Sequence, residues 1–210
     1  MSKMSHNVTI AGRKIRRPII IVGFSRTGTS LIAGIIARHG AWTGICRKAD
    51  KFNQKGYFEN IEITKIIKVK KRTGFIEKVL NILDVEGYTD GPWLVKHYLR
   101  KWDLWKQFKP YYLIPVRDED AVIQSFNRMV SHGVYSEGNL RRKYRKIMKK
   151  AERVAKVHGG VFINSENIVN GDYSEIAEFM AKAGMVFNPK IADRFIVKGY
   201  WHYGNKAKEI

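Results

Sequence analysis

The stretch that decides the fold is Pro18-Ile-Ile-Ile-Val-Gly23-Phe-Ser-Arg26-Thr-Gly28-Thr-Ser30-Leu-Ile32, an apolar run followed by a glycine-containing loop and an amphipathic segment. This order predicts a strand, a phosphate-binding loop and a helix. Gly23 and Gly28 allow the loop backbone to curl so that successive N–H groups point inward. Thr29 and Ser30 add hydroxyls at the start of the helix, whose N-terminus attracts anions. We therefore expect an anion to bind in this loop.

The loop has the glycine spacing of an ATP- or GTP-cleaving enzyme but not its lysine. Thr29 stands where such an enzyme places the lysine that neutralises the β- and γ-phosphates. No clear aspartate completes a magnesium site, because Asp84 follows a segment with a helical pattern and Asp118 is separated from its strand by Arg117. The only cation of the loop is Arg26. A nucleoside or small-molecule kinase is therefore an alternative, but not the favoured one.

A second pattern with ligand-binding chemistry lies in the middle of the chain. Residues 112–116 form an apolar run, and Arg117 follows it directly. The acidic residues from Asp118 to Asp120 predict a helix start, and Ser125 lies eight residues after Arg117 on approximately the same side. Open α/β sheets bind ligands at the carboxyl ends of their strands, so Arg117 and Ser125 are candidate ligand contacts. The alternative is an ion pair of Arg117 with Asp118 or Asp120, and a buried Ser125 hydroxyl.

Both patterns resemble sites of the sulfotransferases that use 3′-phosphoadenosine-5′-phosphosulfate (PAPS). The segment 25–30 is similar to their 5′-phosphosulfate loop, and Arg117 with Ser125 is similar to the pair that holds the 3′-phosphate. Lys198-Gly199 resembles what is left of a basic loop over the same phosphate. The resemblance implies PAPS as donor, adenosine 3′,5′-bisphosphate (PAP) as product, and a set of cofactor-binding residues. They are Gly23, Ser25, Arg26, Thr27, Gly28, Thr29, Ser30, Arg117, Ser125, Lys198 and Gly199.

The resemblance extends over most of the chain, from about residue 17 to about residue 190. Residues 91–97 are similar to the middle strand of the family, which usually ends in a lysine, here Lys96. Residues 56–60 are similar to a loop on the substrate side. Residues 160–179 are similar to the late strand and helix of the family.

Sulfuryl transfer involves less charge than phosphoryl transfer, so a metal ion is dispensable. We assign Arg26 and Lys96 to the sulfonate and the bridging oxygen, where negative charge builds up. The acceptor must lose a proton to a general base. His97 adjoins Lys96, although strand alternation would turn adjacent side chains to opposite faces unless the strand has ended. Glu59 is the other candidate, because several branches of the family use a glutamate, and we favour it.

Length and composition favour one soluble domain. The chain has 210 residues, of which 44% are hydrophobic, enough for one core. We expect a flexible basic N-terminus over residues 1–16 and a single sulfotransferase-like P-loop domain over 17–210. No apolar run approaches the length of a bilayer span, and Cys46 is the only cysteine. These features predict a cytoplasmic protein. No group of Cys and His residues in the sequence has the spacing of metal ligands, so we expect no metal site.

The formal net charge of +20 is unevenly distributed. Between positions 141 and 156, nine Lys and Arg residues stand against the single Glu152, while apolar residues recur at helical spacing. This pattern predicts a long helix over 139–157 with a basic outer face. A second basic stretch lies at 65–72. Such faces are either solvated surfaces or attract an anionic substrate, a nucleic acid or a membrane. PAPS is itself anionic, so nucleic acid is not the favoured partner.

The alternation of strands and helices predicts an α/β fold. We expect a three-layer α/β/α domain with a central, mainly parallel sheet of four to five strands and a P-loop after the first strand. Strands are predicted at 18–23, 92–96, 111–116 and 160–164, with 41–46 as the fifth. Helices are predicted at 29–39, 59–71, 74–84, 99–107, 119–132, 139–157 and 173–184. Arg26, Lys96 and Arg117 each follow a strand, so they come together at one rim of the sheet.

These observations predict a sulfotransferase that moves a sulfuryl group from PAPS to a hydroxyl or amine without a metal. The acceptor is a small molecule or a glycan, and an anionic one if the basic helix helps to bind it. Two alternatives belong to other classes of protein. One is the kinase described above, and the other is a basic nucleotide-binding protein whose catalytic site has decayed, which would explain the high charge.

Overall fold

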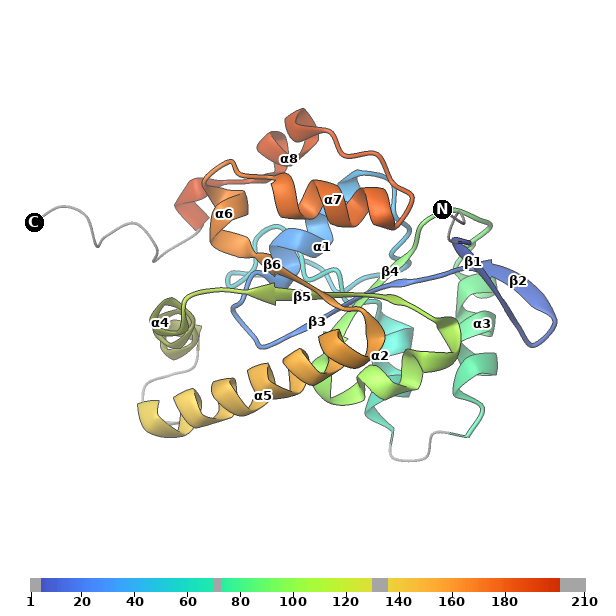
Figure 1. Ribbon diagram of the computed structural model, residues 1–210, viewed down its shortest axis with the longest axis horizontal. Helices are drawn as coiled ribbons and strands as arrows, with labels where there is room; N and C mark the ends of the chain where they lie inside the picture. Colours follow the sequence, from blue (N-terminus) through green and yellow to red (C-terminus); the bar gives the residue numbers. More distant parts are fainter. Residues whose placement is uncertain (1–4, 70–72, 130–135, 201–210) are drawn as a thin grey trace, which may run out of the picture.

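The centre of the molecule is a parallel β-sheet, seen in a computed structural model that describes residues 5–69, 73–129 and 136–200. Its strand order is β4-β3-β5-β6 (Figure 1). The strands are β3 (Ile19–Gly23), β4 (Leu94–Tyr98), β5 (Tyr111–Val116) and β6 (Val161–Asn164). All adjacent pairs are parallel. The predicted α/β fold with a central sheet is confirmed.

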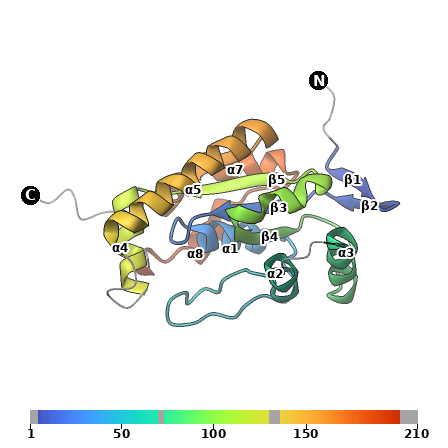
Figure 2. The same cartoon turned by 90° about the horizontal axis from the view of Figure 1, so that it is seen from below.

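Helices cover both faces of this sheet, which gives three layers (Figure 1). On one face lie α1 (Thr29–Arg38), α6 (Ser165–Val169), α7 (Ser174–Lys182) and α8 (Pro189–Phe195). On the other lie α2 (Ile61–Lys68), α3 (Phe75–Val85), the 3₁₀ segment η1 (Leu99–Phe108) and α5 (Glu137–His158). The remaining helices are α4 (Glu119–Met129) and the short η2 (Lys198–Tyr200). Figure 2 shows α5 lying along β5.

The apolar run before the loop forms β3, which is buried on both faces as a central parallel strand should be. Ile19 and Ile21 pack against the α1 layer, whereas Ile20 and Val22 pack against the layer that contains α5. The side chains of the strand therefore alternate between two cores. This alternation also decides which face the residues of the neighbouring strand β4 occupy.

The N-terminal segment is not the flexible tail that we expected. Strands β1 (Asn7–Ile10) and β2 (Arg13–Arg16) form an antiparallel hairpin, and residues 1–4 lie outside the described part. Val8, Ile10 and Ile15 of this hairpin are buried in the core on the α5 side. The basic composition of the segment concealed a period-two apolar pattern, which is the signal of a half-buried strand.

Three other expectations about elements need correction. Residues 41–46 make only isolated bridges, such as Trp42 with Trp93, so the described sheet has four strands. The predicted helix 99–107 is a 3₁₀ segment, and the short helices α6 and α8 were not predicted. Parts of two predicted helices, 70–71 and 130–132, lie outside the described residues. No helix in the described part is both long and apolar enough to cross a membrane.

Candidate active site

The loop between β3 and α1 has the tight backbone that its glycines suggested. Arg26 and Gly28 both have positive φ angles, 74° and 90°. A Cβ atom on Gly23 would lie 3.1 Å from the Thr29 methyl and 3.2 Å from the Thr27 hydroxyl, so this position leaves little room for a side chain. Only glycine adopts positive φ without strain, and Arg26 is held there by the surrounding loop.

Thr27 holds the loop together from inside the protein. Its side chain is fully buried, and its hydroxyl donates a hydrogen bond of 2.8 Å to the Phe24 carbonyl. The buried Ser165 hydroxyl donates to the Thr27 carbonyl over 2.7 Å. Ser165 begins α6 directly after β6, so the end of β6 supports the loop that follows β3. Sequence analysis missed Ser165, although its place after a predicted strand was a usable signal.

A cavity of about 200 Å³ opens beside the loop and brings six of the predicted cofactor-binding residues together. They are Arg26, Gly28, Thr29, Ser30, Arg117 and Ser125. The segment 51–55 also lines the cavity and adds Lys51 and Lys55, which the sequence analysis had not singled out. The described lining therefore contains four cations and no carboxylate. Such a cavity favours an anionic ligand.

Two arginines and a serine from three different segments meet at this cavity. The Arg26 Nε donates to the Ser125 hydroxyl on α4 over 2.9 Å. Arg117 follows β5, and its Nε lies 3.3 Å from a carboxylate oxygen of Glu166. Burial lowers the pKa of Arg117, and the hydrogen bond that Arg117 donates to Glu166 counteracts this effect. The acidic partner of Arg117 in this ion pair is Glu166, and Asp120, one of the two predicted partners, pairs with Arg141. Arg26 therefore lies beside Ser125, one of the two residues that we expect to hold the 3′-phosphate.

Lys96 is the centre of a second cluster. The side chain is buried, and its ammonium donates to the Ser30 hydroxyl and to the Tyr57 carbonyl, each over 2.8 Å. It also lies 3.1 Å from a carboxylate oxygen of Glu59, whose side chain is 24% exposed. Burial lowers the pKa of Lys96, and the charge of Glu59 opposes this shift. The cluster therefore joins the loop to a carboxylate that is partly exposed to solvent, and neither Lys96 nor Glu59 is among the residues that line the cavity.

His97 lies on the opposite face of the sheet from Lys96. Strand β4 continues to Tyr98, which pairs with Gly23, so the alternation of side chains holds through both residues. The buried His97 ring accepts a hydrogen bond of 2.7 Å from the Trp105 indole at its Nε2. Of the two predicted bases, the structure brings Glu59 to Lys96 and places His97 in the other layer.

The remaining predicted residues lie outside the cavity lining. Ser25 belongs to the loop but does not line the cavity, and Gly23 and Thr27 shape the backbone behind it. Lys198 and Gly199 are exposed in η2, immediately after Val197, which does line the cavity. The structure therefore places the candidate basic loop next to the cavity and not within it.

Searches with the sequence find no matching family model. They also find no matching curated protein. Comparison of the structure finds solved proteins of similar fold. A sulfotransferase domain from the curacin biosynthetic pathway aligns with a TM-score of 0.52 and 13% identity, over 83% of this chain and 76% of that domain. Retinol dehydratase, solved with androsterone and the inactive cofactor PAP, aligns with a TM-score of 0.44 and 12% identity, over 89% of this chain and 64% of its own.

The chain is an α/β protein with a sulfotransferase-like fold. The resemblance predicted from the loop and from Arg117 is thus confirmed at the level of the fold. At this identity the likeness concerns the arrangement of the elements, and the chemistry of the site has to be argued from its own residues.

Proposed function

We propose that this protein transfers a sulfuryl group from PAPS to a hydroxyl or amine of a small-molecule or glycan acceptor. The observation that carries the proposal is the meeting of Arg26, Arg117 and Ser125 at one cavity beside the phosphate-type loop. Two anion-binding sites near each other suit a donor that has phosphates at both its 3′ and 5′ positions. The sulfotransferase-like fold supports the same conclusion.

The residues present fit this donor in charge. The loop N–H groups with Thr29 and Ser30 would hold the 5′-phosphate at the start of α1. Arg117 and Ser125, with Arg26 beside them, would hold the 3′-phosphate through charge-assisted hydrogen bonds. The cavity of about 200 Å³ is smaller than the roughly 300–1,000 Å³ of typical ligand sites. Part of the nucleotide must therefore lie outside it, or the segment 51–55 must move.

Glu59 and Lys96 would serve the chemical step. When bound, the donor supplies the sulfuryl group that passes to the acceptor oxygen or nitrogen while PAP leaves. A carboxylate oxygen of Glu59 would accept the proton that the acceptor loses. The Lys96 ammonium, 3.1 Å from Glu59 and 2.8 Å from Ser30, would offset the negative charge that develops on the departing phosphate.

The two alternatives predict different residues or different behaviour. A kinase needs carboxylates for magnesium near its phosphates, and no carboxylate is among the described residues that line the cavity. A decayed nucleotide-binding protein would keep Arg117 and Ser125 but would have no use for a carboxylate paired with a buried lysine. The Lys96–Glu59 pair is therefore the feature that favours an enzyme.

Calorimetric titration of the protein with PAP and with ADP plus Mg²⁺ tests the proposal. We expect PAP to bind at least tenfold more tightly, because only PAP has a 3′-phosphate for Arg117 and Ser125. Transfer of ³⁵S from labelled PAPS to a panel of phenol, sugar and amine acceptors then separates an enzyme from a binding protein. Tighter binding of ADP with Mg²⁺ would contradict the proposal in favour of a kinase.

Replacement of Arg117 should weaken PAP selectively. We expect Arg117→Ala to reduce PAP binding by about 2–4 kcal/mol through the loss of charge-assisted hydrogen bonds, and to leave AMP almost unchanged. Since the substitution also removes the partner of Glu166, Ser125→Ala serves as a second variant that leaves this ion pair intact. Arg38→Ala, at the exposed far end of α1, is the control. Equal losses for PAP and AMP would contradict the assignment.

The burial of Lys96 predicts opposite effects of pH on turnover and on stability. Turnover should fall as pH rises through the lowered pKa of Lys96, because the neutral amine no longer offsets charge. The unfolded chain holds this proton to higher pH, so the free energy of unfolding should rise between the folded and unfolded pKa values. Rate profiles and denaturant titrations measure both trends. A turnover that stays constant up to the ordinary pKa of lysine would exclude this role for Lys96.

A further inference from the structure

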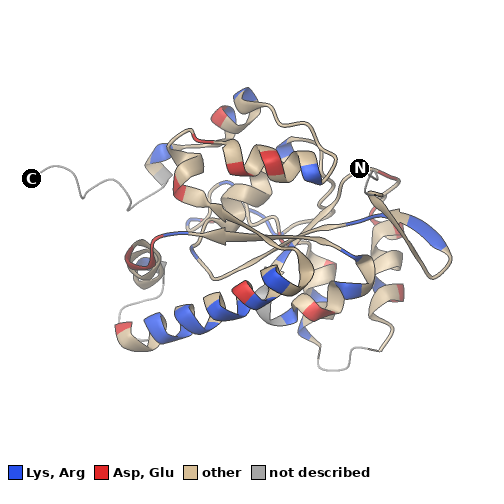
Figure 3. Ribbon diagram, viewed as in Figure 1, with Lys and Arg blue, Asp and Glu red and all other residues tan. Residues whose placement is uncertain are grey.

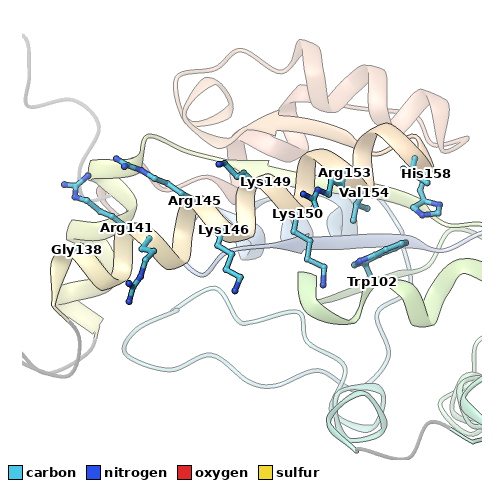
Figure 4. A pocket seen from close by; sticks show the side chains of 12 residues that line it. Trp102, Gly138, Arg141, Arg145, Lys146, Lys149, Lys150, Arg153, Val154 and His158 are labelled. Carbon is cyan, nitrogen blue, oxygen red and sulfur yellow. The ribbon is translucent and has the colours of Figure 1, made fainter.

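A groove of about 950 Å³ runs along α5 (Figure 4). We call it the α5 groove. It runs from Gly138 to His158, which is about 30 Å of helix. Helix α5 packs on the face of the sheet opposite α1, so the α5 groove is separate from the cavity beside the loop. The proposed sulfuryl transfer makes no use of it.

Basic side chains line the α5 groove along its length. Figure 3 shows that Lys and Arg recur along α5. They are Arg141, Arg142, Arg145, Lys146, Lys149, Lys150 and Arg153. Arg141 and Arg145 are neutralised by Glu119 on α4, and Arg141 also pairs with Asp120 and Glu137. These ion pairs neutralise Arg141 and Arg145 at the end of the groove that lies beside α4.

The middle of the α5 groove keeps its charge. Lys146, Lys149, Lys150 and Arg153 have no acidic partner within ion-pair distance in the described part of the chain. Lys146, Lys150 and Arg153 follow one another at spacings of four and three residues, about one helical turn or 5 Å, along one side of the helix, and Lys149 is the chain neighbour of Lys150. Figure 4 shows Lys146 and Lys150 extending on the same side of α5 as Trp102. A regular row of cations in a groove matches a linear polyanion with repeated charges.

Aromatic rings form the far end of the α5 groove. The half-buried Trp102 ring lies 4.6 Å from the His158 ring, and Val157 beside them is 70% exposed. The Lys106 ammonium lies 4.8 Å from the centre of the Trp102 ring. Burial, with a contribution from Lys106, lowers the pKa of His158, which favours the neutral ring. The groove thus ends in an aromatic, apolar surface next to a cation.

We propose that the α5 groove binds single-stranded nucleic acid, with backbone phosphates on the lysines and Arg153 and with an unpaired base on the Trp102–His158 pair. Basic grooves with aromatic stacking surfaces are the general solution for single strands. A polyanion without rings would gain nothing from the aromatic end, and a lipid surface is flat where this site is hollow. The bases of a duplex are stacked on one another, so no base face is free to stack on Trp102.

Fluorescence anisotropy with a labelled oligothymidylate of about 12 nucleotides tests the proposal on the full chain. The groove variant replaces Lys146, Lys149, Lys150 and Arg153 with Gln. We expect it to bind the oligonucleotide at least tenfold more weakly at about 0.1 M salt. Four lost phosphate contacts should also reduce the slope of log affinity against log salt by about 3. The control variant makes the same change of charge at exposed lysines elsewhere. These are Lys14, Lys68, Lys182 and Lys190.

Substitution of Trp102 separates stacking from charge. We expect Trp102→Leu to weaken oligonucleotide binding roughly five- to 100-fold and to leave a heparin oligosaccharide of similar charge unaffected, whereas Trp102→Phe keeps most of the affinity. Unfolding midpoints check that the variants fold. The proposal is overturned if the groove and control variants lose affinity equally. Equal binding of heparin and oligonucleotide with no effect of Trp102→Leu, or binding only to anionic lipid vesicles, would also overturn it.

Discussion

Replacement of Glu59 by Gln should lower the turnover of sulfuryl transfer by about 10²–10⁴-fold and leave the affinity for PAP within about threefold. The amide has almost the shape of the carboxylate but does not accept a proton from the acceptor. Glu59 lies 3.1 Å from the Lys96 ammonium, and its side chain is partly exposed to solvent. The measurement is ³⁵S transfer from labelled PAPS to the best acceptor of the panel.

The comparison variant is His97→Gln, because His97 is the other base that the sequence offers. Since the His97 ring is buried and accepts a hydrogen bond from Trp105, we expect this change to lower the free energy of unfolding by about 1–2 kcal/mol. Its turnover should stay within about threefold of the wild-type value. A large loss of turnover in His97→Gln together with an active Glu59→Gln would reverse the assignment of the base.

Replacement of Lys96 by Met should lower turnover by about 10²–10³-fold, the usual cost of removing a group that stabilises developing negative charge. Methionine keeps the length of the buried side chain but has no charge. We expect the dissociation constant of PAP to change by less than about tenfold, because the loop and Arg117 provide its main contacts. Single-turnover kinetics and calorimetry measure the two quantities separately.

Two controls accompany the Lys96 variant. Lys65→Met removes the lysine of an exposed pair with Glu62, 2.6 Å apart, and should leave turnover unchanged. Lys96 also donates to the Tyr57 carbonyl, so a displaced loop is the competing explanation for a slow variant. A loss of PAP affinity as large as the loss of turnover would show that Lys96 organises the loop and does not act on the reaction.

Much of the phosphate-type site could be predicted from the sequence. The loop after β3, Arg117 after β5 and Ser125 on the next helix all line one cavity, as expected. Their meeting at one cavity could be predicted because it needed only local patterns and one rule of topology, that the carboxyl ends of parallel strands share an edge. The alternation of side chains along β4 likewise turns Lys96 toward α1, where it contacts Ser30.

Other parts of the site left no periodic signal. The segment 51–55 has no regular structure, yet it supplies Lys51 and Lys55 to the cavity and Asn53 to the Ser30 hydroxyl, 2.9 Å away. Glu166 and Ser165 come from a five-residue helix that is too short to show amphipathic spacing. Their roles depend on contacts between residues far apart in the chain. Such contacts are set by packing and not by local preference.

Neighbouring residues alone were enough to predict the strand–loop–helix unit. They also showed that Thr29 stands where a kinase has its catalytic lysine. Only the tertiary structure decided which acid or base lies beside Lys96. That answer required β4 to pair with β3 beyond Lys96, so that the pleat sends His97 into the opposite layer. It also required the chain before α2 to cross the sheet edge and bring Glu59 within 3.1 Å of the ammonium. Both are consequences of long-range packing, which neighbouring residues in the sequence do not encode.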